Sequence, residues 1–424
     1  MVLVGFAQFS LTFCRVWLKL TYSMKNNYRL LSFSVANYRS FCEEQKVDFT
    51  IGDKNPSVLA FYGANASGKS NLYAAMLDFF FLINSSTDPR LIKLPYRPFL
   101  LKQGKNQEPS SFTVTFEDNG ENKKYRYSFS YNAENIVSEE LYDITKTESG
   151  EKIFDRVDGK TAGSKKQFGA KVYDITRDNS LLITSARQFK NKFAMAVLGC
   201  VQSFSLINIG DHNLRNITVD TIQSKPHLKE RVLEMLKKAD FDIRDFSIKV
   251  DKLKTEQINS LPIDQRIKDD MLLNGVQNIL FNTSHKIRND NDEIAGEIIF
   301  EMGTQESFGT NFFFDIIVPI IDSIDNGKTL YIDEFGSGLH SDICAFIIKL
   351  FKDNNNGARL FINTHDTSLM RDVLDRDEIL LVEKNNLERT VITPLRDKRT
   401  VRKDDNIESK YRFGVYGGKP FITQ

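Results

Sequence analysis

The stretch GANASGKSN, from Gly63 to Asn71, constrains the fold of this chain more than any other. It follows the apolar run SVLAFY and precedes NLYAAMLDFFFL, a segment of helical character. Gly63 and Gly68 permit backbone conformations that other residues avoid, so successive N–H groups can point at one anion. The loop ends where a helix is expected to begin, and a helix N-terminus favours negative charge. We therefore expect a buried strand, a phosphate-binding loop and a helix, an order typical of α/β folds.

The loop matches the pattern G-x-x-x-x-G-K-[ST], which assigns roles to its residues. We expect Lys69 to reach the β- and γ-phosphates of ATP and Ser70 to ligate Mg²⁺. A fortuitous glycine-rich turn is the alternative, and the flanking strand and helix argue against it. The other residues expected to contact the nucleotide from this loop are Gly63, Ala64, Asn65, Ala66, Ser67, Gly68 and Asn71.

A second motif, KTLYIDE, is an apolar run that ends in two carboxylates. This is the Walker B arrangement, in which Asp333 would hold the magnesium-bound water and Glu334 would polarise the attacking water. A strand that merely ends in an acidic turn is the alternative. The adjacent Asp and Glu favour ATP hydrolysis over a Ras-like GTPase, and the sequence has no N-K-x-D guanine motif. A small-molecule kinase would place the two motifs closer together in a shorter chain.

The segments after KTLYIDE narrow the class further. FGSGLH is followed by a helical stretch and then by ARLFINTHD, an expected strand that reaches His365. This order matches the D-loop and the switch histidine of ABC-type ATPases, in which the imidazole contacts the γ-phosphate. A structural histidine at a strand end is the alternative.

The segment ESFGTNFFFDIIVPII, which precedes KTLYIDE, has the form of an ABC signature. Ser307 and Gly309 would lie at a helix N-terminus and cap the γ-phosphate of a nucleotide held by another subunit. The segment departs from the common LSGG-like form, since it reads SFGT. An ordinary N-capped helix is the alternative.

NYRSF (Asn37–Phe41), GANASGKSN, ESFGT, LYIDEFGSGLH and NTHDTSL together resemble the RecF/SMC-like branch of ABC ATPases. Within that branch the chain is similar to stand-alone AAA-family ATP-binding proteins of bacterial defence islands. These are the RloA and abortive-infection AbiL type, related to the ATPase half of OLD proteins. The closing FGVYGGKPFI is similar to their C-terminal Gly-x-Tyr-Gly-x-x-Pro-Phe. The resemblance covers about residues 28 to 421.

The resemblance implies that Arg39 and Ser40 approach the nucleotide, although a plain surface loop is the alternative. It leaves the Q-loop glutamine open between Gln103 and Gln188. It implies a Mg²⁺-dependent ATPase that dimerises head to tail or forms a higher homo-oligomer. The 59 residues (424 − 365) after His365 are too few for the TOPRIM nuclease domain of OLD proteins.

This ATPase would therefore act as the sensor or regulatory subunit of an anti-phage, abortive-infection-like system that gates a separate effector. The expected effector is nuclease-like, of the RloB or TOPRIM type. Two alternatives stay open: a RecF-like DNA-repair ATPase, and a scaffold protein with structural nucleotide.

Periodicity predicts an α/β fold with an inserted antiparallel β lobe and a helical lobe. The resemblance implies that this α/β part is an ABC-type P-loop ATPase head. Strands are expected at 28–62, a helix after the loop to about Ile83, a strand at AKVYDIT and a helix at DDMLLNGVQNILF. No heptad pattern persists, so we expect no coiled-coil arm. The expected parts are an N-terminal extension (1–23), the first part of the head (24–95), a β-rich lobe (96–190), a helical lobe (191–295) and the second part of the head (296–424).

Bulk properties limit partners and location. The net charge is +1, so no global field draws the chain to nucleic acid or an anionic membrane. The basic run RDKRTVRK, from Arg396 to Lys403, is the one local candidate for a nucleic-acid or acidic-protein contact, with a solvated loop as its alternative. The four cysteines are scattered, which favours reduced thiols in the cytoplasm.

The apolar N-terminus is interrupted by Arg15 and Lys19 and is too short to span a bilayer, so no membrane association is expected. We interpret residues 1–23 as a start-codon extension or a frayed tail.

Overall fold

The computed structural model describes residues 25–52, 55–158, 160–161, 168–208, 214–274, 277–398 and 406–418. The predicted extension at 1–23 and most of the basic run lie outside these residues. The chain divides into two compact units, and each is described by itself. The first comprises Met1–Gly210, Ile321–Ser337 and Ser341–Gln424, and the second comprises Asp211–Ile320 and Gly338–His340.

A six-stranded sheet forms the centre of the first unit. Its order is β16 (Thr390–Pro394), β15 (Ile379–Lys384), β3 (Val58–Tyr62), β14 (Arg359–Thr364), β13 (Thr329–Phe335) and β9 (Phe204–Asn208). All pairs are parallel except β15 with β16. Every residue of β3 and β14 is buried, as expected for a parallel sheet covered on both faces.

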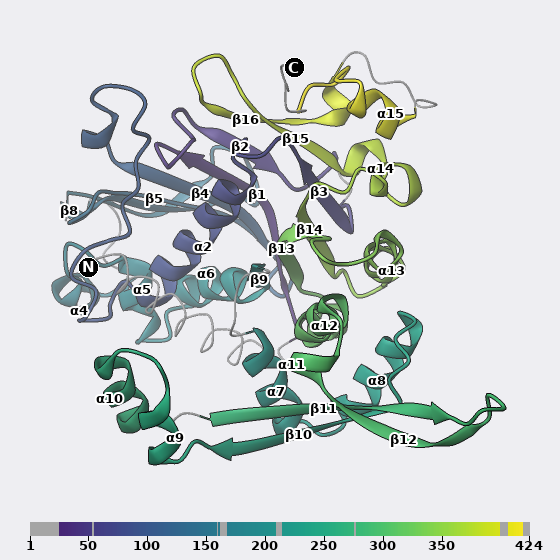
Figure 1. Ribbon diagram of the computed structural model, residues 1–424. Coiled ribbons are helices and arrows are strands. Elements are labelled where there is room, and N and C mark those ends of the chain that lie inside the picture. The colour runs from purple at the N-terminus through teal and green to yellow at the C-terminus, as the bar shows by residue number, and fades with distance from the viewer. Residues whose placement is uncertain are drawn as a thin grey trace. The chain divides into compact units, whose positions relative to one another are not determined.

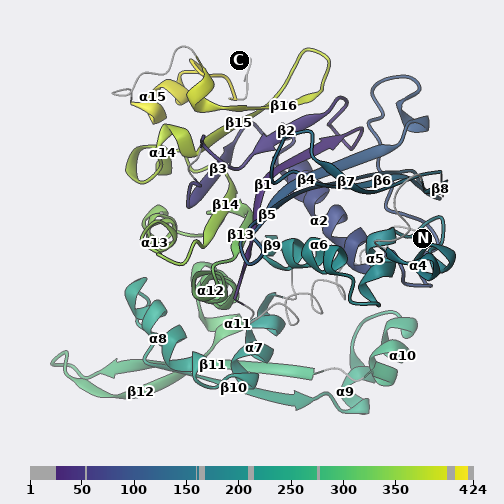
Figure 2. The same cartoon turned by 180° about the vertical axis from the view of Figure 1, so that it is seen from behind.

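Helices lie on both sides of this sheet. α2 (Lys69–Ser85) and α6 (Lys192–Gln202) are on one side, and α13 (Ser341–Lys352) is on the other (Figures 1 and 2). α2 is buried along most of its length, which suits a helix that is apolar on nearly all sides. The predicted α/β fold class is confirmed, as is the predicted helix that begins at the glycine-rich loop.

A second, antiparallel sheet packs across α2. Its order is β2 (Gln45–Asp48), β1 (Tyr28–Ala36), β4 (Ser110–Asp118), β5 (Lys123–Tyr131), β6 (Ile136–Asp143), β7 (Glu151–Val157) and β8 (Lys160–Thr161). Phe79 of α2 lies 5.8 Å from Phe33 and 5.5 Å from Phe129, measured between ring centroids. The strands predicted at 28–62 are present, and β1 pairs directly with β4 of the predicted β lobe. The five-part division of the chain stays a prediction.

One predicted strand is wrong. AKVYDIT forms the helix α4 (Ala170–Ile175) rather than a strand of the β lobe. Its alternation is only a few residues long, a length at which helical and strand periods cannot be separated. The short helices α5 (Leu182–Arg187), α14 (Leu369–Asp372) and α15 (Ile407–Arg412) and the 3₁₀ turns η1 (Lys105–Gln107), η2 (Arg376–Glu378) and η3 (Leu395–Asp397) complete the first unit.

The second unit contains a three-stranded antiparallel sheet, in the order β10 (Asp245–Lys252), β11 (Gln277–Arg288) and β12 (Ile294–Glu301). Phe281 packs against Phe314 with ring centroids 4.2 Å apart. The helices are α7 (Leu214–Ser224), α8 (Leu228–Lys238), α9 (Thr255–Ser260), α10 (Gln265–Asn274), α11 (Met302–Gln305) and the first part of α12 (Phe308–Asn326).

The helix predicted at DDMLLNGVQNILF is wrong in its second half, because α10 ends at Asn274 and β11 begins at Gln277. Asparagine has low helix propensity, and the apolar run that follows is short enough to suit either structure. In the described part of the chain, no helix combines the length and apolar character needed to cross a membrane.

Candidate nucleotide-binding site

The glycine-rich loop joins the end of β3 to the start of α2. Gly68 has φ +116°, and a Cβ at this position would lie 2.2 Å from the hydroxyl oxygen of Thr390. A Cβ at Gly63 would lie 2.2 Å from the carbonyl oxygen of Val382. Both positions therefore require glycine, because β15 and β16 approach the loop backbone too closely for a side chain.

A cavity of about 610 Å³ opens above this loop. It brings together most of the predicted site residues from four separate segments of the first unit. Gly63, Ala64 and Arg39 lie beside the cavity rather than among the residues that line it. The lining residues are Ser40, Asn65, Ala66, Ser67, Gly68, Lys69, Ser70, Asn71, Asp333, Glu334, Asn363, His365 and Lys384.

Lys69 is held inside the loop by main-chain oxygens. Its Nζ donates to the carbonyls of Gly63 at 2.8 Å and Ala64 at 3.1 Å. Burial lowers the pKa of Lys69 to about 8, against the opposing attraction of Asp333 and Glu334. The ammonium is therefore a poorly hydrated cation, and an anion that reaches the cavity would stabilise its charged form.

Ser70 and Asp333 converge at the end of β13. The Ser70 hydroxyl donates to Asp333 Oδ1 at 3.3 Å, and the Asn363 amide donates to the same oxygen at 2.6 Å. Asn208, at the end of β9, donates to the other carboxylate oxygen at 3.2 Å. Asp333 is only 2% exposed. These contacts fix the direction of the carboxylate.

This pair suits Mg²⁺, which proteins usually bind through one or two side-chain oxygens together with substrate phosphates. The described residues contain no cluster of three or more His, Cys, Asp or Glu side chains that could hold a metal alone. The Ser67 hydroxyl supports the same fit, because it is buried without a hydrogen-bond partner in the described part of the chain. A phosphate oxygen in the cavity could accept a hydrogen bond from this hydroxyl.

A β-bulge in β13 places Asp333 and Glu334 in the same cavity. The register with β14 shifts between Ile332 and Phe335, and Glu334 has φ +61°. Consecutive side chains of a regular strand point to opposite faces. The bulge removes this alternation, so that buried Asp333 and exposed Glu334 both line the cavity.

His365 follows β14 and also lines the cavity. Partial burial, and then the Lys69 ammonium, lower the pKa of His365 below its ordinary value, while Asp333 opposes the shift. The imidazole is therefore largely neutral at pH 7, which leaves one ring nitrogen free to donate and the other to accept.

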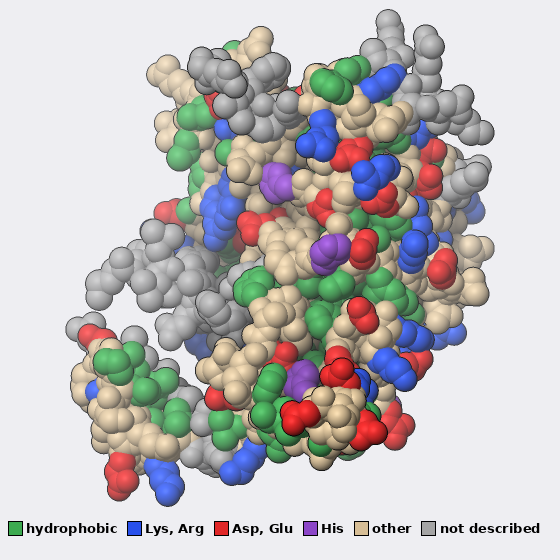
Figure 3. Space-filling model, turned by 45° about the vertical axis from the view of Figure 1, so that its right-hand side comes forward, with side chains coloured by type: hydrophobic (Ala, Val, Ile, Leu, Met, Phe, Trp, Pro, Cys, Tyr) green, Lys and Arg blue, Asp and Glu red, His purple; other side chains and the backbone are tan. Residues whose placement is uncertain are grey.

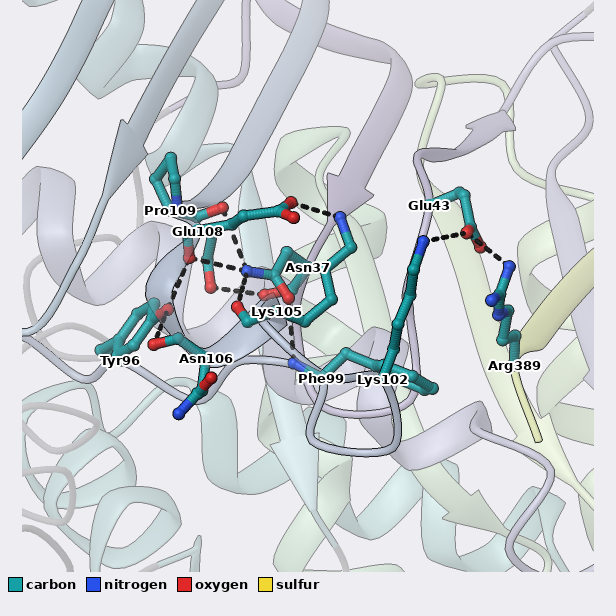
Figure 4. A network of polar contacts seen from close by, with 11 residues as sticks. Asn37, Glu43, Tyr96, Phe99, Lys102, Lys105, Asn106, Glu108, Pro109 and Arg389 are labelled. Atoms are coloured by element: carbon teal, nitrogen blue, oxygen red, sulfur yellow. Dashed lines mark hydrogen bonds and ion pairs between the residues drawn. The ribbon is translucent and has the colours of Figure 1, made fainter. Parts of the chain in front are cut away.

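Asn37, two residues before the predicted Arg39, lies at the centre of a polar network (Figure 4). The Asn37 side chain donates to the carbonyl of Glu108 at 2.7 Å, and its oxygen accepts from the amide of Phe99 at 3.1 Å. Arg39 in turn donates to Asn71 Oδ1 at 3.2 Å, and Asn71 donates to Ser40 at 2.7 Å. The NYRSF segment thus contacts the first turn of α2 directly.

Several residues that line or contact this site were not predicted from the sequence. Asn363 of β14 lies two positions before His365 and lines the same cavity, and the two-residue period of a strand could have revealed it. Thr390 donates to the carbonyl of Ser67 at 2.7 Å, and Lys384 lines the cavity from the end of β15. Neither Gln103 nor Gln188 is among the lining residues.

The predicted signature residues belong to the second unit. The Ser307 hydroxyl accepts from the backbone N–H of Thr310 at 3.0 Å and so caps the start of α12. Gly309 lies in the first turn of that helix, where a Cβ would lie 3.0 Å from the carbonyl oxygen of Gly338. The ordinary capping role named above as an alternative is therefore present, and the role in a second subunit stays a prediction.

Residues 58–371 match the protein family described as "AAA domain, putative AbiEii toxin, Type IV TA system". The chain belongs to this AAA domain family. The match spans the glycine-rich loop, the β13 carboxylates and His365. No curated protein is significantly similar to the chain.

Three solved structures similar to this AAA domain protein are an SMC head domain, a RecF protein and an Smc head bound to part of ScpA. The SMC head domain from Thermotoga maritima has a TM-score of 0.42 and 14% identity, covering 86% of this chain and 98% of that one. The recombination mediator protein RecF in complex with "ATPrS" has a TM-score of 0.36 and 14% identity, covering 87% and 99%. A structure of the Smc head bound to the C-winged helix domain of ScpA has a TM-score of 0.43 and 10% identity, covering 86% and 96%.

Proposed function

We propose that this chain binds ATP in the cavity above the glycine-rich loop and hydrolyses it with Mg²⁺. The observation that carries the proposal is the 3.3 Å contact between Ser70 and Asp333, in one cavity with Lys69. A hydroxyl, a fixed carboxylate and a buried ammonium are the groups that a magnesium–phosphate complex requires. Family membership supports the same activity.

Each residue then has a defined task. Lys69 exchanges the carbonyls of Gly63 and Ala64 for phosphate oxygens, and the backbone N–H groups of the loop bind the remaining phosphate oxygens. Ser70 and Asp333 would hold Mg²⁺, which would neutralise charge on the phosphates. Glu334 accepts a proton from the attacking water, and neutral His365 contacts the γ-phosphate. The water oxygen bonds to the γ-phosphorus as the bond from that phosphorus to the β–γ bridging oxygen breaks, which gives ADP and inorganic phosphate.

The direct test is release of phosphate from ATP by the purified full-length protein. We expect steady turnover with Mg²⁺ and a fall of at least about 100-fold when EDTA removes the metal. Restoring Mg²⁺ should restore the rate. ADP retained through purification, with no phosphate release in any condition, would instead indicate a scaffold with structural nucleotide.

Affinity for ATP should fall as pH rises above about 8. The free protein loses the Lys69 proton near pH 8, whereas bound phosphate favours the ammonium and raises the pKa of Lys69 in the complex. Binding above pH 8 must therefore take up a proton, which raises Kd by up to about tenfold per pH unit. Calorimetry in buffers of different ionisation enthalpy at pH 8.5 measures this uptake. A constant Kd from pH 7 to pH 9 would contradict it.

We further propose a cytoplasmic sensor or regulatory subunit that dimerises, with Ser307 and Gly309 of one copy completing the site of the other. The dimer would gate a separate, nuclease-like effector during phage infection. The resemblance of the motifs and the toxin–antitoxin wording of the family description support this role. Phage plating on cells that carry the gene with its neighbouring reading frames, or with a Lys69→Met copy, tests it. If cells that carry K69M remain protected against phage, ATP does not control the effector.

The alternative to the proposed defence role is a RecF-like role in DNA repair. On the face shown in Figure 3, basic and acidic side chains are interspersed, in keeping with the net charge of +1. Affinity for DNA that falls steeply with salt would favour the repair role.

A further inference from the structure

Lys384 lies beside the phosphate-binding loop because of the register of the central sheet. β15 pairs in parallel with β3, and Leu381 stands opposite Tyr62, the last residue of β3. β3 then becomes the loop, while β15 continues as a strand to Lys384. The carbonyl of Val382 approaches Gly63 so closely that no Cβ fits between them. Lys384 therefore emerges next to the loop and lines its cavity.

The ammonium of Lys384 forms a solvent-exposed ion pair with Glu388, which another anion could replace. Its Nζ lies 3.0 Å from Glu388 Oε2, in the turn between β15 and β16. The two side chains are 32% and 63% exposed, and ion pairs this accessible to water contribute little to stability. A phosphate oxygen could replace the Glu388 carboxylate with little loss to the fold.

The negative charge of a triphosphate in this cavity would be better balanced by two cationic side chains than by Lys69 alone. The residues that line the cavity include two lysines, Lys69 and Lys384, and two carboxylates, Asp333 and Glu334. Lys69 is committed to the interior of the loop through its two carbonyl contacts. A polyphosphate that fills the cavity would bring anionic oxygens to Lys384 as well as to Lys69, because both lysines line it.

We propose that Lys384 is a nucleotide-binding residue that leaves Glu388 to contact the phosphate chain of ATP. This inference rests on the proposed ATP site and adds a ligand-dependent exchange to it. Glu388 is then a competitor for the same ammonium, so that its carboxylate weakens ATP binding. The β15–β16 turn that carries it would sense whether phosphate is present.

The test measures Kd for ATP and for inorganic tripolyphosphate in the full-length protein. Lys384→Met should weaken both about tenfold, the usual worth of one charge-assisted hydrogen bond. Glu388→Gln should tighten both about two- to fivefold, yet have no effect when Lys384 is already Met. Lys123→Met removes a comparable surface ion pair with Asp143 outside the cavity and should leave both values unchanged. All variants should melt within about 2 °C of wild type.

Several outcomes overturn the inference. Unchanged Kd values in K384M would show that Lys384 does not touch the ligand. Weakened ATP binding with unchanged tripolyphosphate binding would place the contact on the nucleoside instead. If E388Q changes Kd equally in the wild type and in K384M, Glu388 does not compete with phosphate for the Lys384 ammonium. A different result would contradict the proposed ATP site itself: no measurable ATP binding by the wild type or by K69M.

Discussion

Replacing Glu334 with glutamine should lower kcat for ATP hydrolysis by at least about 100-fold while ATP affinity stays within about threefold of wild type. The amide has nearly the same size as the carboxylate, so the cavity keeps its shape. It cannot accept a proton from the attacking water, however. Phosphate release and equilibrium ATP binding, measured on the same preparation, separate the two effects. Glu117→Gln, on the antiparallel sheet where Glu117 pairs with Lys124 at 2.8 Å, is the matched control.

The same variant should accumulate the proposed dimer in the presence of ATP and Mg²⁺, because it would not consume the nucleotide proposed to join two copies. Light scattering after size exclusion measures the mass. Ser307→Asp keeps a helix-capping side chain but places negative charge toward the phosphate, so it should prevent dimerisation in the E334Q background. Ser307→Asn, a neutral cap, should permit it. Normal turnover by E334Q would contradict the assignment of Glu334.

Replacing Lys69 with methionine should raise the Kd for ATP by about 100-fold or more, the largest loss of binding expected in this chain. The variant loses the cation that phosphate stabilises inside the loop. Its folding should not suffer, because Lys69 is 7% exposed and burial disfavours its charged form. At pH 7 the melting temperature of K69M should equal or exceed that of wild type.

The stability difference has a predictable pH dependence. The folded-state pKa of Lys69, about 8, lies below the unfolded value, so the unfolded chain binds more protons between about pH 8 and pH 10.4. Wild-type stability should therefore rise relative to K69M through that window and differ least above it. Loss of ATP binding together with a lower melting temperature at pH 7 would indicate misfolding rather than a missing phosphate contact.

The residues proposed to carry the site's chemistry could be placed in one cavity from the sequence because they lie within short contiguous motifs. Lys69 and Ser70 share one loop, Asp333 and Glu334 share one strand end, and His365 directly follows β14. Their convergence follows from the rule that parallel strands present their carboxyl ends at one edge of a sheet. The helix and strands around the loop follow from hydrophobic periodicity alone.

The residues around them depend on pairings between distant segments. Asn208 reaches Asp333 because β9 pairs with β13 in a register that sets these two residues opposite each other. Thr390 and Lys384 reach the loop because β15 pairs with β3, although the two strands are far apart in sequence. Local patterns hold no information on such a register. The helix at Ala170–Ile175 was missed for the opposite reason, because a short pattern suited two structures equally.

The bulge at the end of β13 also sets a limit on how stable this protein can become. A glutamate with φ +61° occupies a backbone region that costs a non-glycine residue about 1 kcal/mol or more. Glycine or asparagine at 334 would relieve that cost. Variants selected for thermal resistance alone should therefore drift toward these residues and lose turnover. On the proposed mechanism, the glutamate at 334 serves turnover at a cost to fold stability.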